Sequence, residues 1–276
     1  MMNTQQVEKI KSKSDWFEVY KINDQTFGIV EPNHAEKVIS YLIMGKERAV
    51  LFDTGMGIAD IRSEVASLTS LPIVVVNSHS HYDHIGGNHQ FHDIWSFENA
   101  FENNRIERGY SHDECVKYMN DGSYVHLPKG FDLSKFMVPG SCITKYLTHE
   151  EKIDLGERIL TVHSTPGETP GAITLSDDLF NILFVGDLMY SGTIWMHLKE
   201  SSWSQFVSSV NYIDSLSNNA GLICPGHNDV CLQTDFVRRV KQSTGWIDEK
   251  VVSGVMEQDN IVYKFEGFSI LTNNLK

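Results

Sequence analysis

Apolar residues recur along the chain at two spacings, and each spacing predicts a different kind of element. Short runs rich in β-branched and aromatic residues, bounded by turn-forming residues, predict strands. Early strands are expected at residues 15–20, 26–30, 38–44, 49–53, 73–76 and 94–97. Later strands are expected at residues 152–153, 158–163, 172–176, 181–185, 222–224 and 261–265, the last at a sheet edge. Apolar residues at helical spacing predict helices at 58–68, 203–216 and 233–249.

Residues 98–147 interrupt this alternation with scattered aromatic and methionine side chains. Helices are expected around 98–108 and 112–119, and the remainder is expected to be loop. Two interpretations stay open: a lid or pocket wall beside a functional site, or a peripheral insertion with a small core of its own. Residues 1–14 are polar and are expected to be frayed.

Strands before residue 95 and again after residue 150 favour two packed sheets with helices outside, an α/β fold. The chain has 276 residues, of which 41% are apolar, so it can bury a sizeable core. We therefore expect a single domain over residues 1–276, with a lid or insert at about 98–147.

Composition narrows the classes of function and partner. A formal net charge of −13 argues against a nucleic-acid surface, which needs clustered Lys and Arg. The four cysteines form no Cys-x-x-Cys pair, and the N-terminus lacks an apolar signal core, so a cytoplasmic protein is expected. No stretch approaches the ~20 apolar residues of a membrane span. We expect a small-molecule substrate and no nucleic-acid or membrane partner; a homo-oligomer is left open.

Residues 77–87, Asn-Ser-His-Ser-His-Tyr-Asp-His-Ile-Gly-Gly, carry the densest candidate chemistry. They follow the buried strand predicted at 73–76, so the side chains of His79 and His81 are expected to face the same way. Asp83 and His84 can supply ligands to a second centre, and the glycines after them allow a tight turn. Imidazole and carboxylate are the ligands of hydrolytic zinc sites. A surface histidine cluster would explain neither the strand nor the glycines.

This stretch resembles the His-x-His-x-Asp-His signature of the metallo-β-lactamase fold superfamily, and four further motifs follow that family's order. They are Phe-Asp-Thr-Gly at 52–55, Thr-Pro-Gly-Glu-Thr-Pro-Gly at 165–171, Phe-Val-Gly-Asp at 184–187 and Cys-Pro-Gly-His at 224–227. The resemblance covers roughly residues 15–235. It implies an αββα sandwich, with two mixed β-sheets flanked by helices and a metal site at one end.

The resemblance also implies a ligand set for two divalent metal ions. His79 and His81 would hold the first ion, Asp83, His84 and His227 the second, and Asp187 would bridge both. The residues themselves support the bridge, because two neighbouring cations need an anion between them. Asp187 follows an apolar run and a glycine, where a strand end can project a carboxylate.

Glu168 departs from the family's pattern, which usually has histidine at this position as the third ligand of the first metal. A carboxylate is a competent zinc ligand, and some members that resemble alkylsulfatases use Glu here. Two alternatives are that Glu168 points away and leaves the first site damaged, or that His163 substitutes for it. Zinc is expected at both sites, with manganese or iron as alternatives because Glu168 adds a harder oxygen ligand.

Other polar residues receive more modest roles. Asp53 is expected to orient His84 or its loop through the second ring nitrogen; the alternative is a cap on the following helix. His197 is a candidate for a substrate-facing or supporting role. The remaining histidines are expected to be on the surface or locally hydrogen-bonded: His34, His89, His92, His112, His126 and His149.

The predicted function is a metal-dependent hydrolase. A metal-bridged hydroxide would cleave an ester, lactone, thioester or amide bond of a small molecule, with Asp83 orienting the nucleophile and handling its proton. Two alternatives come from other classes. One is a mononuclear-iron oxidoreductase of the same fold, similar to persulfide dioxygenases. The other is a non-catalytic binding protein with a decayed metal site.

Overall fold

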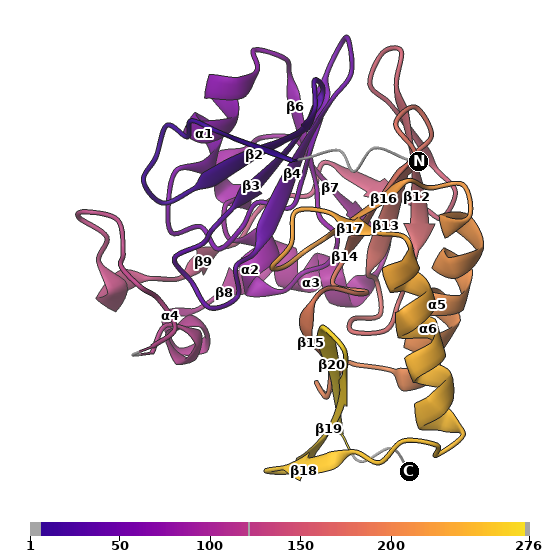
Figure 1. The fold of residues 1–276 in the computed structure, drawn as a ribbon. Coiled ribbons are helices and arrows are strands. Elements are labelled where there is room, and N and C mark those ends of the chain that lie inside the picture. Colours follow the sequence, from indigo (N-terminus) through magenta and orange to yellow (C-terminus); the bar gives the residue numbers. More distant parts are fainter. Residues whose placement is uncertain (1–6, 121, 274–276) are drawn as a thin grey trace. The chain divides into compact units, whose positions relative to one another are not determined.

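A computed structural model describes residues 7–120 and 122–273 (Figure 1). The chain divides into two compact units, here called unit 1 and unit 2. Unit 1 comprises Met1–Leu147 and Ile153–Ile159, and unit 2 comprises Thr148–Lys152 and Leu160–Lys276. The single-domain organisation and the lid at about 98–147 stay predictions.

Unit 1 is built on one mixed sheet with the strand order β1-β2-β3-β4-β5-β6-β7-β10. Neighbours from β1 to β5 run antiparallel, whereas β5, β6, β7 and β10 run parallel. The strands are β1 (Glu8–Ile10), β2 (Glu18–Asn23), β3 (Thr26–Val30), β4 (Ile39–Met44), β5 (Ala49–Phe52), β6 (Ile73–Val76), β7 (Ile94–Phe97) and β10 (Lys145–Leu147). The predicted strand pairs 15–20 with 26–30 and 38–44 with 49–53 are confirmed, with shifted ends.

Two details at the start of unit 1 correct the sequence prediction. Residues 8–10 were expected to be frayed, but β1 pairs with β2 and Lys9 contacts Glu18 at 2.6 Å. Pairing at a sheet edge needs only backbone groups, so the polar side chains gave no signal. Residues 1–6 lie outside the described residues. The strand expected from residue 15 begins at Glu18, because Ser14 and Trp16 form a side-chain-stabilised turn (Trp16 N to Ser14 Oγ, 3.1 Å).

Helix α1 (Ile61–Leu68) covers one face of this sheet (Figure 1). Ile61 and Val65 are buried in the same apolar core as Leu51 and Val75 from β5 and β6. The helix was expected from residue 58 but begins three residues later, because Asp60 accepts a hydrogen bond from Ser63 N (2.8 Å) and caps it. The apolar run 73–76 is confirmed as the buried strand β6.

Residues 98–147 lie within unit 1 and share its core. Ile106, Tyr110, Met119 and Phe136 belong to the same apolar cluster as Trp16, so the expected alternative of a separate small core is wrong. The helix expected at 112–119 is a single turn followed by a 3-10 turn. The elements are α3 (Ala100–Arg108), β8 (Gly109–Tyr110), α4 (His112–Cys115), η2 (Val116–Tyr118), η3 (Leu133–Lys135) and β9 (Val138–Pro139).

Unit 2 contains a mixed sheet and a second, smaller sheet. The first has the order β12-β13-β14-β16-β17, and the second has the order β15-β20-β19-β18. The strands of the first are β12 (Ile159–Ser164), β13 (Ile173–Asp177), β14 (Ile182–Gly186), β16 (Leu222–Pro225) and β17 (Leu232–Gln233). Those of the second are β15 (Gly192–Met196), β20 (Phe268–Thr272), β19 (Asn260–Phe265) and β18 (Val255–Glu257). β11 (Lys152–Asp154) spans the sequence boundary between the units.

The strand predicted at 261–265 as a sheet edge is instead an interior strand, β19, with β20 and β18 on either side. Neither of these two partner strands was predicted from the sequence. β18 is solvent-exposed throughout, so it has no hydrophobic alternation to reveal it. β20 does alternate, and its signal was overlooked.

Helices α5 (Trp203–Ser217) and α6 (Asp235–Asp248) lie side by side in unit 2 (Figure 1). Both agree closely with the predicted helices. Phe206 and Val210 from α5 and Val237 and Val240 from α6 are buried in one core with Ile223 from β16. No helix among the described residues is long and apolar enough to cross a membrane.

Candidate metal centre

The histidine cluster, defined here as His79, His81, Asp83 and His84, sits at the carboxyl end of β6. Its side chains are buried except for His81, which is partly buried. Tyr82–Ile85 forms the one-turn helix α2, so Asp83 and His84 are presented from helical backbone immediately after the extended residues. His79 Nε2 lies 2.9 Å from His81 Nδ1, which confirms that these two side chains face the same way.

Asp53, which directly follows β5, contacts the histidine cluster and the residue before it. Its Oδ2 lies 2.9 Å from His84 Nδ1, and both side chains are fully buried. Asp53 also accepts hydrogen bonds from Ser78 N (2.7 Å) and Ser78 Oγ (2.6 Å). The predicted orienting contact to His84 is therefore confirmed, and the alternative of a helix cap is wrong because Asp60 caps α1. A carboxylate that accepts from Nδ1 leaves Nε2 of His84 as the lone-pair nitrogen.

The backbone of Asp53 is strained in a way that fits this role. Its φ is +65°, a left-handed conformation that is uncommon outside glycine and is adopted most often by asparagine, aspartate and histidine. Such strain costs on the order of 1–3 kcal/mol and persists where the surroundings fix it. Here the parallel pairing of β5 with β6 and the bond from Asp53 N to Val76 O (3.0 Å) fix the turn that aims the carboxylate at His84.

The glycines after the cluster form the predicted turn, and they also allow close packing. Gly86 has an ordinary helical φ of −58°. A Cβ placed on it would lie 2.1 Å from the carbonyl carbon of Met56. A Cβ on Gly87 would lie 2.6 Å from Thr54 O. Glycine is thus required because the loop after β5 lies directly against the backbone that follows His84.

A buried polar network that the sequence did not predict joins the residues around the cluster. Asn88 Nδ2 donates to Asn77 Oδ1 (2.8 Å), and Thr54 Oγ1 donates to Asn88 Oδ1 (2.8 Å). Thr54 N also donates to His84 O (2.8 Å). These bonds tie together the two loops that carry Asp53 and His84. The sequence did contain a signal for this network, because an Asn lies at each end of the histidine stretch.

Residues of the 98–147 segment contact the histidine cluster's loop within unit 1. Tyr110 donates its hydroxyl to Ser80 O (2.8 Å), and burial raises the pKa of this phenol. Tyr118 stacks on Tyr82 with ring centroids 4.0 Å apart. Both aromatic side chains therefore support the loop backbone from the segment that the sequence predicted as a lid or wall.

Unit 2 contributes the remaining predicted ligands from what we call the carboxylate loops, which carry Glu168, Asp187 and His227. All three side chains are buried, at 6%, 8% and 4% exposure. Asp187 directly follows β14 and His227 lies two residues beyond β16, as the motifs predicted. These strands are parallel neighbours, so their carboxyl ends lie at one sheet edge, where Asp187 Oδ2 contacts His227 Nε2 at 2.9 Å. Gly226 N also donates to Gly186 O (2.8 Å).

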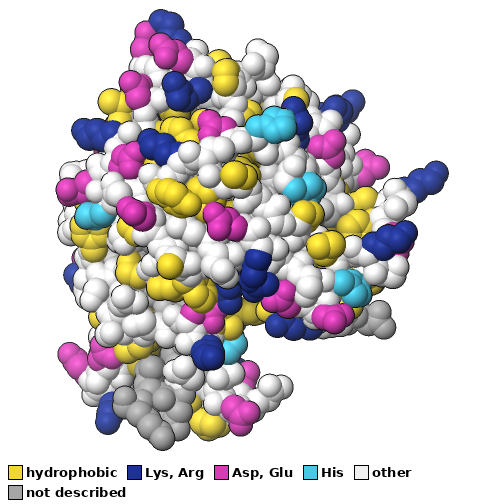
Figure 2. Space-filling view, turned by 180° about the vertical axis from the view of Figure 1, so that it is seen from behind, with side chains coloured by type: hydrophobic (Ala, Val, Ile, Leu, Met, Phe, Trp, Pro, Cys, Tyr) yellow, Lys and Arg dark blue, Asp and Glu magenta, His cyan; other side chains and the backbone are white. Residues whose placement is uncertain are grey.

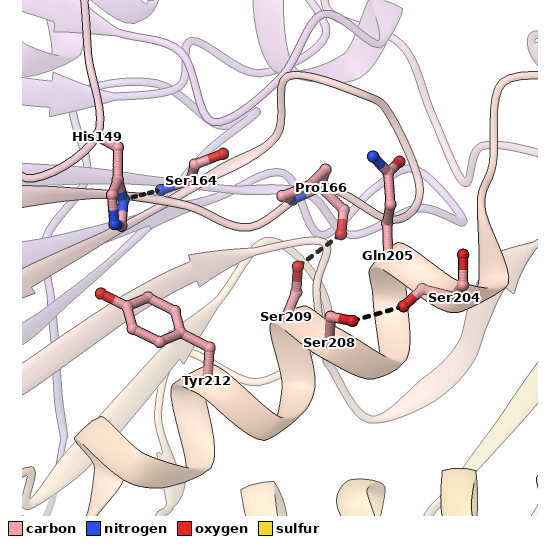
Figure 3. A pocket seen from close by; sticks show the side chains of 8 residues that line it. All are labelled: His149, Ser164, Pro166, Ser204, Gln205, Ser208, Ser209 and Tyr212. Atoms are coloured by element: carbon pink, nitrogen blue, oxygen red, sulfur yellow. Dashed lines mark hydrogen bonds between the residues drawn. The ribbon is translucent and has the colours of Figure 1, made fainter.

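The loop that carries Glu168 is fastened to the N-terminal part of α5. Ser209 Oγ donates to Pro166 O (2.6 Å), as Figure 3 shows, and Ser201 Oγ donates to Glu168 O (3.0 Å). A Cβ on Gly167 would lie 2.8 Å from Phe206 Cα, so only glycine allows this approach. The side chain of Glu168 is buried and does not face solvent, and the loop backbone is held at Pro166 and Glu168. Its role as a metal ligand stays a prediction.

His163 is engaged elsewhere. Its Nδ1 lies 2.9 Å from Tyr212 Oη and its Nε2 lies 2.8 Å from Ser176 Oγ, so both ring nitrogens have hydrogen-bond partners within unit 2. Burial lowers the pKa of His163. It therefore does not replace Glu168 as a ligand in this arrangement. A neighbouring cavity of about 390 Å³, lined by His149, Tyr212 and serine side chains of α5, is drawn in Figure 3.

The other histidines differ in their surroundings. His34 was expected at the surface or locally hydrogen-bonded; it is buried at 3% exposure and its Nε2 contacts Tyr118 O (3.1 Å). His197 is partly buried, its ring contacts Trp195, and burial lowers its pKa. Its expected substrate-facing or supporting role stays a prediction.

The donor set fits divalent metal ions. All seven predicted ligands are among the His, Asp and Glu side chains that form candidate metal-binding groups in the described residues: His79, His81, Asp83, His84, Glu168, Asp187 and His227. Buried carboxylates without a compensating charge are costly. Neutral imidazole with carboxylate is the chemistry that zinc, manganese and iron accept.

The fold and these motifs define a class of protein. The family model of the metallo-beta-lactamase superfamily matches residues 36–227, and the chain belongs to this superfamily. The predicted family, the mixed α/β metallo-β-lactamase fold and the metal-dependent hydrolase class are confirmed.

Among curated proteins, the chain is similar to acyl-coenzyme A thioesterase MBLAC2 of Homo sapiens and of Bos taurus. Each is 30% identical over 234 residues, which cover 78% of this chain and 82% of the relative. The protein of the same name from Gallus gallus is 28% identical over 231 residues, with the same coverage of both chains.

Solved structures show the same fold at lower identity. A metallo-beta-lactamase from Pontibacter korlensis has a TM-score of 0.60 at 15% identity, covering 83% of this chain and 99% of that chain. A metallo-beta-lactamase family protein from Thermus thermophilus has a TM-score of 0.61 at 16% identity, covering 84% of this chain and 83% of that chain.

Proposed function

We propose that this protein is a metal-dependent thioesterase that hydrolyses acyl thioesters such as acyl-coenzyme A. The observation that carries the proposal is the buried histidine cluster with its orienting Asp53, in a chain of this superfamily. The curated relatives named as acyl-coenzyme A thioesterases support the choice of a thioester among the four predicted bond types.

The proposal includes the ligand set. His79, His81 and Glu168 would hold one ion, Asp83, His84 and His227 a second, and Asp187 would be shared; zinc is the first choice, and manganese and iron are the alternatives. When bound, such ions polarise a carbonyl oxygen and lower the pKa of water towards neutrality. The support for the set is the burial of the side chains and the donor chemistry within each unit.

The chain's own groups then have defined tasks. Asp53 keeps the proton of His84 on Nδ1 and fixes the ring, so the cluster's geometry is set before substrate arrives. We assign to Asp83, whose Oδ2 lies 3.6 Å from His84 Nε2, the task of accepting the proton of the attacking water. A new C–O bond forms at the acyl carbon, the C–S bond breaks, and Asp83 returns the proton to the departing sulfur.

The charge of the protein shapes the expected substrate preference. Figure 2 shows one face of the molecule, on which Lys and Arg side chains are mixed with Asp and Glu side chains. With a net charge of −13, the protein offers little general attraction to the phosphates of coenzyme A. We therefore expect acyl thioesters of short phosphate-free thiols to be cleaved as well.

The test is a substrate panel on purified protein whose metal content has been measured. Thiol release is followed with acyl-coenzyme A and with the matching acyl-N-acetylcysteamine, beside an oxygen ester, a lactone and a phosphodiester. Thioester cleavage that is lost with a chelator and restored by zinc or manganese supports the proposal. Cleavage of the oxygen esters alone would contradict it, one iron per chain would indicate the oxidoreductase, and no metal with no turnover would indicate a binding protein.

A cytoplasmic location is a further part of the proposal, and assembly as a homo-oligomer is left open. The location rests on the four cysteines, which form no Cys-x-x-Cys pair. Cell fractionation and the mass of the protein in solution test the two points separately.

A further inference from the structure

Two cysteine side chains face each other across neighbouring strands of unit 2. β16 and β17 are antiparallel, with Leu222 opposite Gln233 and Ile223 opposite Leu232. The same register places Cys224 opposite Cys231, and their sulfur atoms lie 3.6 Å apart. Directly opposed residues of an antiparallel pair have Cα atoms roughly 4.5–5.5 Å apart, which is within the range that a disulfide spans.

The two thiols differ in access. Cys224 is completely buried, and burial raises the pKa of its thiol. Cys231 is partly exposed, so an oxidant in solution meets Cys231 first. The other cysteines have different neighbours: Cys115 Sγ contacts Tyr110 O at 3.9 Å, and the exposed Cys142 Sγ contacts Ile143 O at 3.8 Å.

The residues between the two cysteines carry a predicted metal ligand. His227 lies three residues after Cys224, and residues 225–230 form the loop that a bond between the two sulfurs would close. This loop is fastened to the Asp187 loop: Gly226 N donates to Gly186 O (2.8 Å) and Asn228 Nδ2 donates to Ser191 O (2.6 Å). A change in strand spacing at the cysteines therefore acts on the backbone that positions His227.

We propose that Cys224 and Cys231 are a redox-sensitive dithiol that closes to a disulfide and reopens, a modification site on the His227 loop. The oxidant is a low-molecular-weight disulfide of the glutathione class. The Cys231 thiolate attacks it, forms a mixed disulfide and releases one thiol. The Cys224 thiolate then attacks the Cys231 sulfur and releases the second thiol. Two protein thiols are oxidised to one disulfide, and one external disulfide is reduced to two thiols.

Closure requires the sulfur atoms to approach from 3.6 Å to roughly 2.05 Å. The two side chains must rotate to bring the sulfur atoms together, and any change in the spacing of the strand ends is passed to the His227 loop. The expected consequence is weaker metal binding by His227 in the oxidised protein; this part rests on the proposed function, whereas formation of the disulfide does not.

The experiment uses the full chain and separates the two parts. Protein carrying Cys142→Ser, which removes the exposed thiol, is treated with glutathione disulfide and then with dithiothreitol. Peptide mapping is expected to find Cys224 joined to Cys231, with the loss of two titratable thiols and their return on reduction. In the matched Cys142→Ser/Cys231→Ser protein, no such bond can form and Cys224 is expected to stay reduced because it is buried.

Metal binding is measured on the same samples by competition with a chromogenic chelator. We expect the oxidised Cys142→Ser protein to release metal about tenfold more readily than its reduced form, and the Cys231→Ser control to show no change on oxidation. Mixed disulfides on Cys231 without the 224–231 bond would overturn the dithiol assignment. The bond without any change in metal release would overturn its effect on His227, and would leave the thioesterase proposal standing.

Discussion

The histidine cluster and the carboxylate loops supply the same kind of side chain but are built differently. The cluster places four candidate ligands within six consecutive residues at the end of one strand, and Asp53 and Ser78 hold them by hydrogen bonds. The carboxylate loops take Glu168, Asp187 and His227 from three separate loops of unit 2. One region is fixed mainly by local backbone, and the other by long-range sheet and helix packing.

Because of this difference, the two regions are expected to tolerate substitutions to different degrees. A local cluster keeps its geometry as long as one strand and its neighbour persist. The carboxylate loops depend on the parallel pairing of β14 with β16 and on the attachment of the Glu168 loop to α5. We therefore expect substitutions in unit 2 to change metal binding more, and substitutions around the cluster to change stability and ring orientation.

The largest effect is expected for Asp187→Asn. The change keeps the shape but removes the negative charge that the proposed shared ligand provides. We expect a loss of about 10³-fold in kcat/KM together with loss of metal, which elemental analysis measures. Asp178→Asn, an exposed aspartate on the same unit, is the matched control and should leave both unchanged. A metal-replete, active Asp187→Asn protein would refute the shared-ligand role.

The buried side chain of Glu31 provides a test of stability in unit 1. Burial raises the pKa of Glu31 to about 7 from 4.5, against hydrogen bonds from Trp16 and Met56 N that lower it. The pKa of Glu31 is higher in the folded protein than in the unfolded chain. The stability that protonated Glu31 contributes is therefore complete below pH 4.5 and is lost as the pH rises through 7. The loss is about 3 kcal/mol of unfolding free energy.

Glu31→Gln removes this titration, so the difference in unfolding free energy between wild type and variant should shift by that amount from pH 4.5 to 7.5. Urea unfolding of the metal-free proteins at both pH values measures it. A difference that stays constant across the range would show that Glu31 titrates normally in the folded protein.

Asp53→Asn tests whether the carboxylate of Asp53 orients His84 in the histidine cluster. The amide cannot accept the His84 Nδ1 proton as a carboxylate does, although it fills the same space. Loss of such a supporting carboxylate typically lowers metal affinity about 10–100-fold. Chelator competition measures the affinity, and Asp24→Asn at the exposed β2–β3 turn serves as the control. Equal affinities in Asp53→Asn and wild type would count against the orienting role.

The smallest effect is expected for Glu168→His, which restores the ligand that is more usual in the family. Metal should be retained. Replacing an anion by a neutral imidazole leaves the metal ions more electron-poor, so the pH–rate profile should move to lower pH, by about one unit. A profile displaced to higher pH would contradict the assigned charge effect.

The local motif was readable from sequence because its ligands, strand and glycines are contiguous. The strands at 73–76, 182–186 and 222–225 were predicted by their apolar runs and deliver the motif residues where expected. The reason for Gly86 could not be read, because it depends on a loop that follows β5, more than twenty residues earlier. The Asn77–Asn88 pair did leave a signal, an Asn at each end of the histidine stretch, that the prediction did not use. β1 and β18 were hidden because their mostly exposed side chains show no hydrophobic alternation.

The most direct test of the central claim, that both regions supply metal ligands, is the metal stoichiometry of wild type and Glu168→Ala. Elemental analysis with native mass spectrometry gives the number of ions per folded chain. The account predicts two in wild type and one in Glu168→Ala, because Asp83, His84 and His227 would still hold the second ion. Unchanged occupancy in Glu168→Ala would contradict the assignment of Glu168 and leave the first ion to His79, His81 and Asp187 alone.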